Sequence, residues 1–202
     1  MQKLIGNLNK GRLFVVSAPS GSGKTTLVRM LTKEFPNVIE SVSFTTREIR
    51  NNEKKDLDYF YISKEEFEKK IKEKEFLEYA SVFDNYYGTS KKVIEKDLIN
   101  KKHVVLVIDT QGAKKLINKI DATFIFIAPL SIDELKNRLK LRQQNNDSEI
   151  EKRLSWAKEE LKEIKHYDYL IINDDLKIAY EILKSIFIAE DNKIKNGVNF
   201  GK

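Results

Sequence analysis

Short apolar segments alternate with amphipathic segments along most of the chain. The apolar segments are rich in β-branched and aromatic residues, which is typical of strands in a parallel sheet buried on both faces. Such strands are predicted at Arg12–Ala18, Val38–Ser43, Val104–Ile108, Thr123–Ala128 and Tyr169–Ile172. Helices are predicted at about Lys24–Phe35, Ser131–Arg142, Asp147–Lys165 and Leu176–Asp191. Alternating strands and helices predict an α/β fold, with a central parallel sheet in a three-layer α/β/α core.

The pattern changes between residues 43 and 88. Two aromatic-rich segments, Asp58–Ile62 and Phe76–Phe83, lie on either side of a short and very polar helix. Ser63 and Glu66 have the spacing of a capping box at the start of that helix. These features predict a small mixed α+β region inserted into the core. The polar stretch Gln143–Ser148, between two charged helices, predicts the tip of a second excursion.

The net charge of +6 does not indicate a nucleic-acid partner. Residues 1–12 carry three basic and no acidic side chains, and residues 192–202 carry another three. The remaining residues, 13–191, therefore hold 31 basic and 31 acidic side chains. Because a groove for a phosphate backbone needs clustered positive charge, we expect no nucleic-acid binding.

Composition also excludes several kinds of site. The chain has no cysteine, which excludes disulfides, thiolate zinc sites and a cysteine nucleophile. Its two histidines, His103 and His166, are far apart in sequence, and we interpret them, like Trp156, as packing or surface residues. The apolar runs are too short to cross a bilayer and the N-terminus lacks the apolar stretch of a secretory signal. We expect a soluble cytoplasmic protein without membrane contact.

A phosphate-binding loop is the strongest motif. It follows a predicted buried strand and opens a helix, which is the context that such a loop requires. Glycines allow backbone N–H groups to turn toward phosphate oxygens, and the helix N-terminus favours negative charge. Its first position, usually glycine, is Ala18 here. The residues expected to bind ATP are Ala18, Pro19, Ser20, Gly21, Ser22, Gly23, Lys24, Thr25 and Thr26, with Lys24 on the β- and γ-phosphates and Thr25 on Mg²⁺.

Asp109 ends the apolar run that starts after His103. A carboxylate at the end of a strand beside a phosphate loop acts on Mg²⁺ through water or on a bound substrate. An aspartate at this position also caps the helix that follows, and the two roles are compatible.

Arginine is rare in this chain, because lysine supplies most of the positive charge. Arginine is therefore expected where a planar, bidentate guanidinium matters. The seven arginines are Arg12, Arg29, Arg47, Arg50, Arg138, Arg142 and Arg153.

Taken together, these motifs resemble the guanylate kinase family over residues 12–190. The resemblance rests on APSGSGKTT, SFTTREIR, DYFYI, EFLEYA, NYYGTS, VLVIDTQG, FIFIAP, the arginines at 138, 142 and 153, and IINDD. It implies a single domain over residues 1–202. The implied parts are a core of residues 12–42, 92–136 and 160–191, a GMP-binding region of residues 43–91, and a helical lid of residues 137–159.

The resemblance also implies the GMP-binding residues. Ser43, Arg47, Arg50, Tyr59 and Tyr87 match family positions that hold the monophosphate, and Glu78 and Thr89 match those that read guanine, with Asp109 close to the same nucleotide. Taken alone, the two arginines also fit a solvated strand end, the two tyrosines core packing, and Glu78 a solvated acid.

The remaining implied residues belong to the lid and the ATP side. Arg138 and Arg142 share a helix face because they are four residues apart. With Arg153 they match family lid arginines that close over the triphosphate. Asn173 matches a position near adenine.

The implied reaction is ATP + GMP ⇌ ADP + GDP, with dGMP as a second acceptor and Mg²⁺ as cofactor. A phosphate oxygen is the nucleophile, so no general base is needed. Catalysis would rest on Lys24, Arg47, Arg142 and Arg153, which position and neutralise the transferred phosphoryl group. The alternatives are a P-loop kinase of another small phosphorylated acceptor, such as a ribose bisphosphate, and a non-catalytic guanylate-kinase-like interaction domain. The sequence leaves open whether the protein is a monomer or a homodimer.

Overall fold

The computed structural model describes residues 11–50, 53–82, 84–141 and 147–193. A five-stranded parallel sheet forms its centre, with the strand order β2-β7-β1-β8-β9. The strands are β1 (Leu13–Ser17), β2 (Val38–Glu40), β7 (His103–Val107), β8 (Thr123–Ala128) and β9 (Tyr169–Ile172). A parallel strand on each side of β1 places the carboxyl ends of β1 and β7 at the same edge, where α/β sheets bind ligands.

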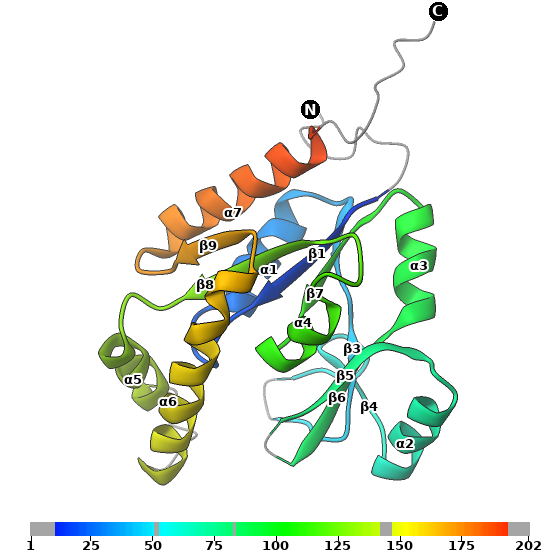
Figure 1. The fold of residues 1–202 in the computed structure, drawn as a ribbon, viewed down its shortest axis with the longest axis horizontal. Coiled ribbons are helices and arrows are strands. Elements are labelled where there is room, and N and C mark those ends of the chain that lie inside the picture. The colour runs from blue at the N-terminus through cyan, green and yellow to red at the C-terminus, as the bar shows by residue number, and fades with distance from the viewer. Residues whose placement is uncertain (1–10, 51–52, 83, 142–146, 194–202) are drawn as a thin grey trace, which may run out of the picture.

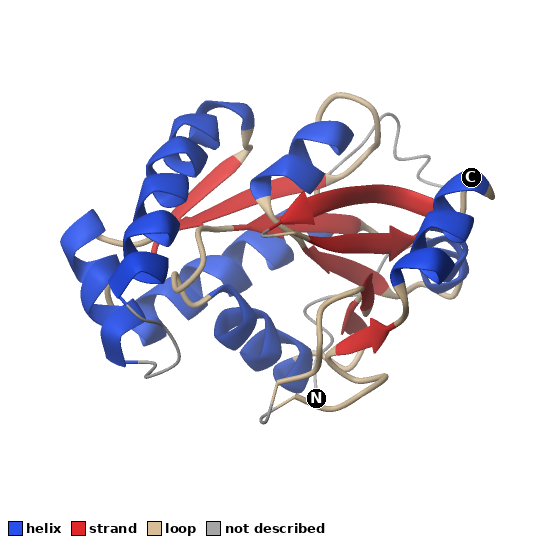
Figure 2. Cartoon of the chain, turned by 90° about the horizontal axis from the view of Figure 1, so that it is seen from below, coloured by secondary structure: helices blue, strands red, loops and turns tan. Residues whose placement is uncertain are grey.

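Helices cover both faces of this sheet, as Figures 1 and 2 show. Phe14 and Val16 of β1 pack with α1 (Lys24–Glu34) and α7 (Leu176–Asp191). Leu13 and Val15 point to the opposite face, which α3 (Lys91–Ile99) and α4 (Thr110–Leu116) cover. Side chains alternate along a strand, so a strand that is apolar throughout needs a helical layer on each side. The predicted three-layer α/β/α core is confirmed.

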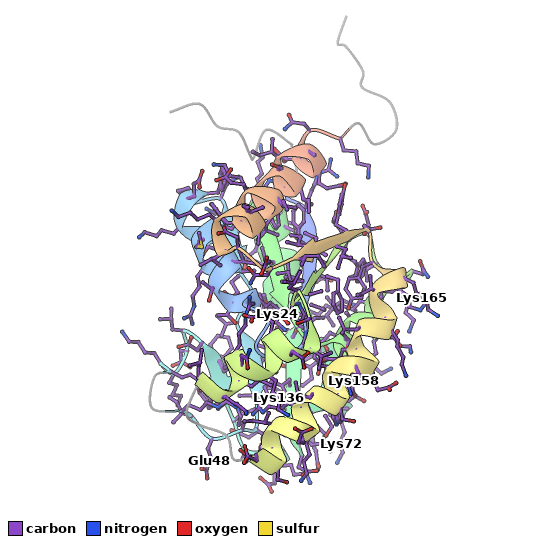
Figure 3. The ribbon with its side chains drawn as sticks, turned by 90° about the vertical axis from the view of Figure 1, so that its left-hand side faces the viewer. Lys24, Glu48, Lys72, Lys136, Lys158 and Lys165 are labelled. Atoms are coloured by element: carbon purple, nitrogen blue, oxygen red, sulfur yellow. The ribbon has the colours of Figure 1, made fainter. Side chains whose placement is uncertain are left out.

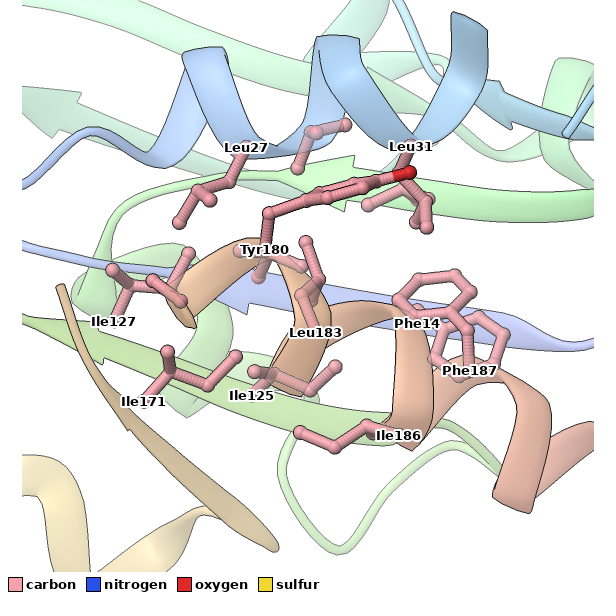
Figure 4. Packing of buried hydrophobic residues seen from close by; sticks show 14 of the residues in the cluster. Phe14, Leu27, Leu31, Ile125, Ile127, Ile171, Tyr180, Leu183, Ile186 and Phe187 are labelled. Atoms are coloured by element: carbon pink, nitrogen blue, oxygen red, sulfur yellow. The ribbon is translucent and has the colours of Figure 1, made fainter. Parts of the chain in front are cut away.

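The layer under α7 holds the larger apolar cluster. Leu27 and Leu31 of α1 meet Leu183 of α7 above the sheet (Figure 4), and all three side chains are fully buried. The rings of Phe14 and Phe187 stack with centroids 3.7 Å apart. Complete burial of each such side chain contributes about 1.5–3 kcal/mol. This packing fixes the start of α1, and with it the loop that precedes the helix.

A second sheet carries the inserted region. Its strand order is β4-β3-β6-β5, made of β3 (Ser43–Thr45), β4 (Tyr59–Tyr61), β5 (Phe76–Val82) and β6 (Asn85–Ser90). Helix α2 (Lys64–Lys72) begins with the predicted capping box of Ser63 and Glu66. Phe67 of α2 is fully buried and stacks on Phe76, with centroids 4.5 Å apart. The prediction of a mixed α+β insertion is confirmed.

One predicted strand is wrong in extent. Val38–Ser43 is not continuous, because β2 ends at Glu40 and Ser43 begins β3 in the other sheet. Ser41 still donates its backbone N–H to Val105 of the core sheet, whereas Ser43 pairs with Tyr59 of the second sheet. No glycine or proline marks this crossing within residues 38–45, so the sequence alone shows one strand.

Helices α5 (Ile132–Leu141) and α6 (Asp147–Lys162) pack against each other around a small apolar cluster of their own. The second helix was predicted to reach Lys165, but it ends at Lys162 and continues as the 3₁₀ turn Glu163–His166. Of the predicted polar tip, Asp147 and Ser148 begin α6 and the rest lies outside the described residues. None of the described helices is both long and apolar enough to cross a bilayer.

Candidate active site

The loop between β1 and α1 adopts a backbone that needs glycine. Gly21 and Gly23 have φ angles of +100° and +89°. Gly23 stands at the N-cap of α1 without a side-chain cap, so the first N–H groups of the helix remain available to a ligand. A Cβ on Gly23 would lie 2.3 Å from the Asn173 amide nitrogen. The predicted strand–loop–helix context is confirmed.

Lys24 lies beneath this loop. Its Nζ lies 3.1 Å from the Ile108 carbonyl and 3.5 Å from the Ala18 carbonyl. Figure 3 shows Lys24 near the middle of the molecule, with Lys158 and Lys165 along the helices at one edge. Burial lowers the pKa of Lys24, while the charges of Glu160, Asp109 and Glu40 act in the opposite direction. The ammonium is therefore surrounded by acids and aimed at the carboxyl end of the sheet.

Glu78 and Asp109 come together across the two sheets. The Thr89 hydroxyl donates to Glu78 Oε1 at 2.5 Å, and both residues are buried. Asp109 Oδ1 accepts from the Gly112 N–H at 2.7 Å, which confirms that Asp109 caps α4. A Cβ on Gly112 would lie 2.5 Å from Glu78 Oε2 and 3.3 Å from Asp109 Oδ1, so only glycine allows this approach. Burial chiefly raises the pKa of Glu78 to about 7, and the nearby Asp109 adds to the effect.

Arg47, Tyr59 and Tyr87 form a second cluster. The Arg47 Nε donates to the Tyr87 hydroxyl at 3.2 Å, and the guanidinium lies 5.5 Å from the centre of the Tyr59 ring. The two tyrosine rings meet edge to face, with centroids 5.9 Å apart. Ser43 is buried beside them because it pairs with Tyr59 across β3 and β4. Arg50 is exposed, and its backbone N–H donates to Glu53.

Helix α6 contacts the loop between β1 and α1. Arg153 of α6 donates from Nη1 to the Ser20 hydroxyl at 2.8 Å. Arg138 of α5 pairs with Glu134 on its own helix at 2.8 Å. Arg142 lies outside the described residues. A pocket of about 80 Å³ opens between this loop and α6, and its lining includes Ser20, Asp109, Gln111, Arg153, Trp156 and Glu160.

Comparison with known proteins assigns the family. The profile described as guanylate kinase matches residues 10–190. The guanylate kinase of Protochlamydia amoebophila is 54% identical over 189 residues, covering 94% of this chain and 96% of its own. That of Clostridioides difficile is 46% identical over 193 residues, covering 95% and 94%. The crystal structure of guanylate kinase from Anaplasma phagocytophilum matches with a TM-score of 0.77 and 33% identity, covering 92% of this chain and 88% of its own.

This chain belongs to the guanylate kinase family. Neither of the two alternatives is favoured by these relatives, which are all named for the kinase. The resemblance inferred from the motifs is therefore confirmed.

Sequence reasoning missed two residues of the candidate site. Glu160 of α6 is largely buried and accepts from the Thr110 hydroxyl at 3.3 Å. Burial chiefly raises its pKa to about 7, while the charge of Lys24 opposes this. Gly112 is the other, since it separates Glu78 from Asp109. Glu160 has no local signal because it is one of several acids on a charged helix, whereas the pairing of Asp109 with a glycine three residues later is visible in VLVIDTQG.

Three residues set aside at the outset have distinct surroundings. Trp156 is 41% exposed and lines the pocket beside α6, so it is a surface residue next to the candidate site. His103 is buried, and its Nε2 lies 3.0 Å from Asp191 Oδ1 at the other end of the sheet. His166 is largely exposed.

Asn173, by contrast, contacts the phosphate loop directly. Its side-chain amide N–H donates to the Ser22 carbonyl at 2.7 Å, which holds the loop in place.

Proposed function

We propose that this chain transfers the γ-phosphoryl group of ATP to GMP, and to dGMP, giving ADP and the nucleoside diphosphate. The observation that carries the proposal is the hydrogen-bonded pair of Glu78 and Thr89, which lies beside Asp109. Asp109 follows β7 at the edge of the sheet where the phosphate loop also lies. A carboxylate accepts from guanine N1–H and the 2-amino group, and the hydroxyl faces O6. Adenine has an acceptor at N1 and no 2-amino group, so it would leave a buried carboxylate unpaired.

On the donor side, we assign the triphosphate to residues 18–26 and to the lid residues 137–159. Lys24 neutralises the β- and γ-phosphates, and the open N–H groups at the start of α1 bind phosphate oxygens. Arg138, Arg142 and Arg153 complete the charge around the triphosphate when the lid closes. Asn173 supports the loop near the adenine side.

On the acceptor side, we assign GMP to residues 43–91 together with Asp109. The phosphate dianion binds to Arg47 and Arg50, whose guanidinium groups donate charged hydrogen bonds to it. Ser43, Tyr59 and Tyr87 supply hydroxyl groups. Arg47 therefore acts in catalysis by placing the acceptor oxygen in line with the γ-phosphorus.

Mg²⁺ is the cofactor that this chemistry calls for. The available donors are the Thr25 hydroxyl and, through water, the Asp109 carboxylate, which are the oxygen ligands that Mg²⁺ prefers. The described residues hold no group of three metal-binding side chains, and Mg²⁺ at kinase sites takes its remaining ligands from phosphates and water. When bound, Mg²⁺ neutralises charge on the transferred group. Lys24, Arg142 and Arg153 do the same from the protein, and closure of the lid excludes water.

A coupled assay of ADP release tests the assignment. Mg-ATP is offered with GMP, dGMP, AMP, UMP, CMP or ribose 1,5-bisphosphate as acceptor. We expect activity with GMP and dGMP. Equal rates with AMP would refute the role of Glu78, and preference for ribose 1,5-bisphosphate would establish the alternative kinase.

Substitution of Lys24 tests the donor side. Lys24→Ala should lower kcat by about 10²–10³, because one preorganised charge is lost. Lys33→Ala, at the exposed end of the same helix, is the matched control and should leave kcat unchanged. Near-normal turnover of Lys24→Ala would show that the loop does not bind the triphosphate as proposed.

A further inference from the structure

Glu53 gathers several donors of the proposed phosphate site around one carboxylate. The Arg47 Nη2 lies 2.7 Å from Glu53 Oε1 and 2.9 Å from Oε2. The Tyr61 hydroxyl donates to Oε2 at 2.7 Å, and the backbone N–H of Arg50 donates to it at 3.1 Å. The side chains of Arg47 and Glu53 are 12% and 18% exposed. One carboxylate therefore connects the Arg47–Arg50 turn to strand β4.

Two explanations predict opposite effects of this contact. In the first, the Glu53 carboxylate competes with phosphate for the Arg47 guanidinium and has to be displaced. In the second, it stays bound and keeps the guanidinium oriented for the phosphate. Displacement would also take the acceptor away from the half-buried Tyr61 hydroxyl, which costs free energy when it is left unpaired, and would release the exposed Arg50 N–H to water. Burial raises the pKa of Glu53, but hydrogen bonds from Tyr61, Arg47 and Arg50 outweigh this and lower it. These hydrogen bonds therefore favour the ionised form of Glu53 in its present position.

Glu53 also completes the orientation of Arg47. The Nε donates to Tyr87 and the Nη1 donates to the Glu48 carbonyl at 2.6 Å, so all three nitrogens of the guanidinium are held. The plane is fixed beside the Tyr59 ring. A guanidinium has five N–H donors, so an arginine held in this way keeps donor capacity for a phosphate oxygen.

We propose that Glu53 is a positioning residue for the acceptor phosphate, which orients Arg47 and fixes the Arg50 backbone against β4. This inference rests on the proposed function, because it takes Arg47 and Arg50 to bind the phosphate of GMP. Orienting a guanidinium before the substrate arrives removes a rotamer cost from binding. The effect therefore belongs to GMP and not to ATP.

Glu53→Gln tests the proposal, with Glu48→Gln as the matched control. Both substitutions remove one negative charge from the same turn, but the Glu48 side chain is exposed (Figure 3) and only its carbonyl contacts Arg47. Steady-state kinetics should show KM for GMP raised about tenfold in Glu53→Gln, since a hydrogen bond to a charged group is lost. KM for ATP should change less than about twofold, and Glu48→Gln should resemble the wild type.

Two results would overturn the proposal. A lower KM for GMP in Glu53→Gln would show that the carboxylate competes with the phosphate, and an unchanged KM would show that it does neither. A wild-type enzyme without activity on GMP would instead refute the proposed function, which is measured first. If Glu53→Gln does not fold, Tyr61→Phe removes one partner of the same carboxylate and should raise KM for GMP in the same direction.

A double-substitution cycle separates positioning from general stability. The Arg47→Lys variant lacks the planar guanidinium that Glu53 orients. Adding Glu53→Gln to this variant should therefore change KM for GMP by less than about twofold. The same tenfold effect in both backgrounds would show that Glu53 does not act through Arg47.

Discussion

The ionisation of Glu78 should control recognition of GMP near neutral pH. This carboxyl is 6% exposed and accepts one hydrogen bond, from Thr89. Burial raises its pKa to about 7, the negative charge of Asp109 adds to this, and the hydrogen bond from Thr89 opposes it. Only the ionised form accepts from both N1–H and the 2-amino group of guanine. The free enzyme therefore has to lose a proton before it binds GMP in the proposed way.

The size of the effect follows from the titration. With a pKa of about 7, the ionised fraction of Glu78 is about 0.9 at pH 8 and about 0.1 at pH 6. We expect kcat/KM for GMP to fall about tenfold from pH 8 to pH 6, because this parameter reports groups of the free enzyme. The coupled assay at saturating Mg-ATP measures it. A profile that is lowest at pH 8 would have the wrong sign for this role.

Glu78→Gln is the control that isolates the side chain. The phosphate of GMP also titrates near pH 6, and this contribution remains in the variant. The ratio of wild-type to variant kcat/KM should therefore rise about tenfold between pH 6 and pH 8. The variant should also lose most of its preference for GMP over AMP. A constant ratio across this range would refute the reasoning, because Glu78 would then not need its charge.

The same titration affects stability. Because the folded pKa of Glu78 is raised from 4.5 to about 7, the folded state binds more protons than the unfolded state in this range. Stability is therefore lost as pH rises through this window. Glu78→Gln lacks this loss, so its free energy of unfolding relative to wild type should increase by at most about 3 kcal/mol from pH 5 to pH 8. Urea unfolding at both pH values measures the difference.

Two further predictions concern residues outside base recognition. Gly23→Ala should lower the free energy of unfolding by about 1–3 kcal/mol and weaken Mg-ATP binding, because the new Cβ would collide with Asn173 and because alanine is strained at the φ of +89°. Thermal unfolding with and without Mg-ATP measures both effects, and unchanged values would contradict the prediction. His103 is buried, which lowers its pKa although Asp191 opposes this, so stability should fall as pH drops below about 6.5. His103→Gln should lack that loss in melts from pH 5 to pH 7.5 and keep both KM values, whereas an identical pH dependence would rule out His103.

The elements that local sequence determines were predictable. The phosphate loop needs two residues with positive φ, and glycine at Gly21 and Gly23 supplies them wherever the rest of the chain lies. The core strands are short apolar runs whose two buried faces require helices on both sides. The capping box of α2 is likewise a contact over three residues, so Ser63 and Glu66 reveal it without a tertiary structure.

Contacts between distant segments were not predictable in the same way. Glu160 faces Lys24 across more than a hundred residues, and its helix carries other acids at similar spacing. The end of β2 at Glu40 depends on which sheet the following residues join, and no glycine or proline marks that point in the sequence. Glu78 has a role only because Thr89 pairs with it across β5 and β6. Resemblance to a family supplied that pairing, while periodicity did not.

The acids of the site show why it is costly to build and why substrates should stabilise it. Glu78 and Glu160 have pKa values raised to about 7, chiefly by burial, and Asp109 adds negative charge to both. Burial lowers the pKa of Lys24 in turn. Burial therefore disfavours the charge of each group, and the opposite charges already nearby offset this only in part. Guanine donors would pair with Glu78, and phosphate would pair with Lys24. Nucleotide binding would therefore offset the desolvation cost of these buried charges, so the contacts that recognise the nucleotides should also stabilise the fold.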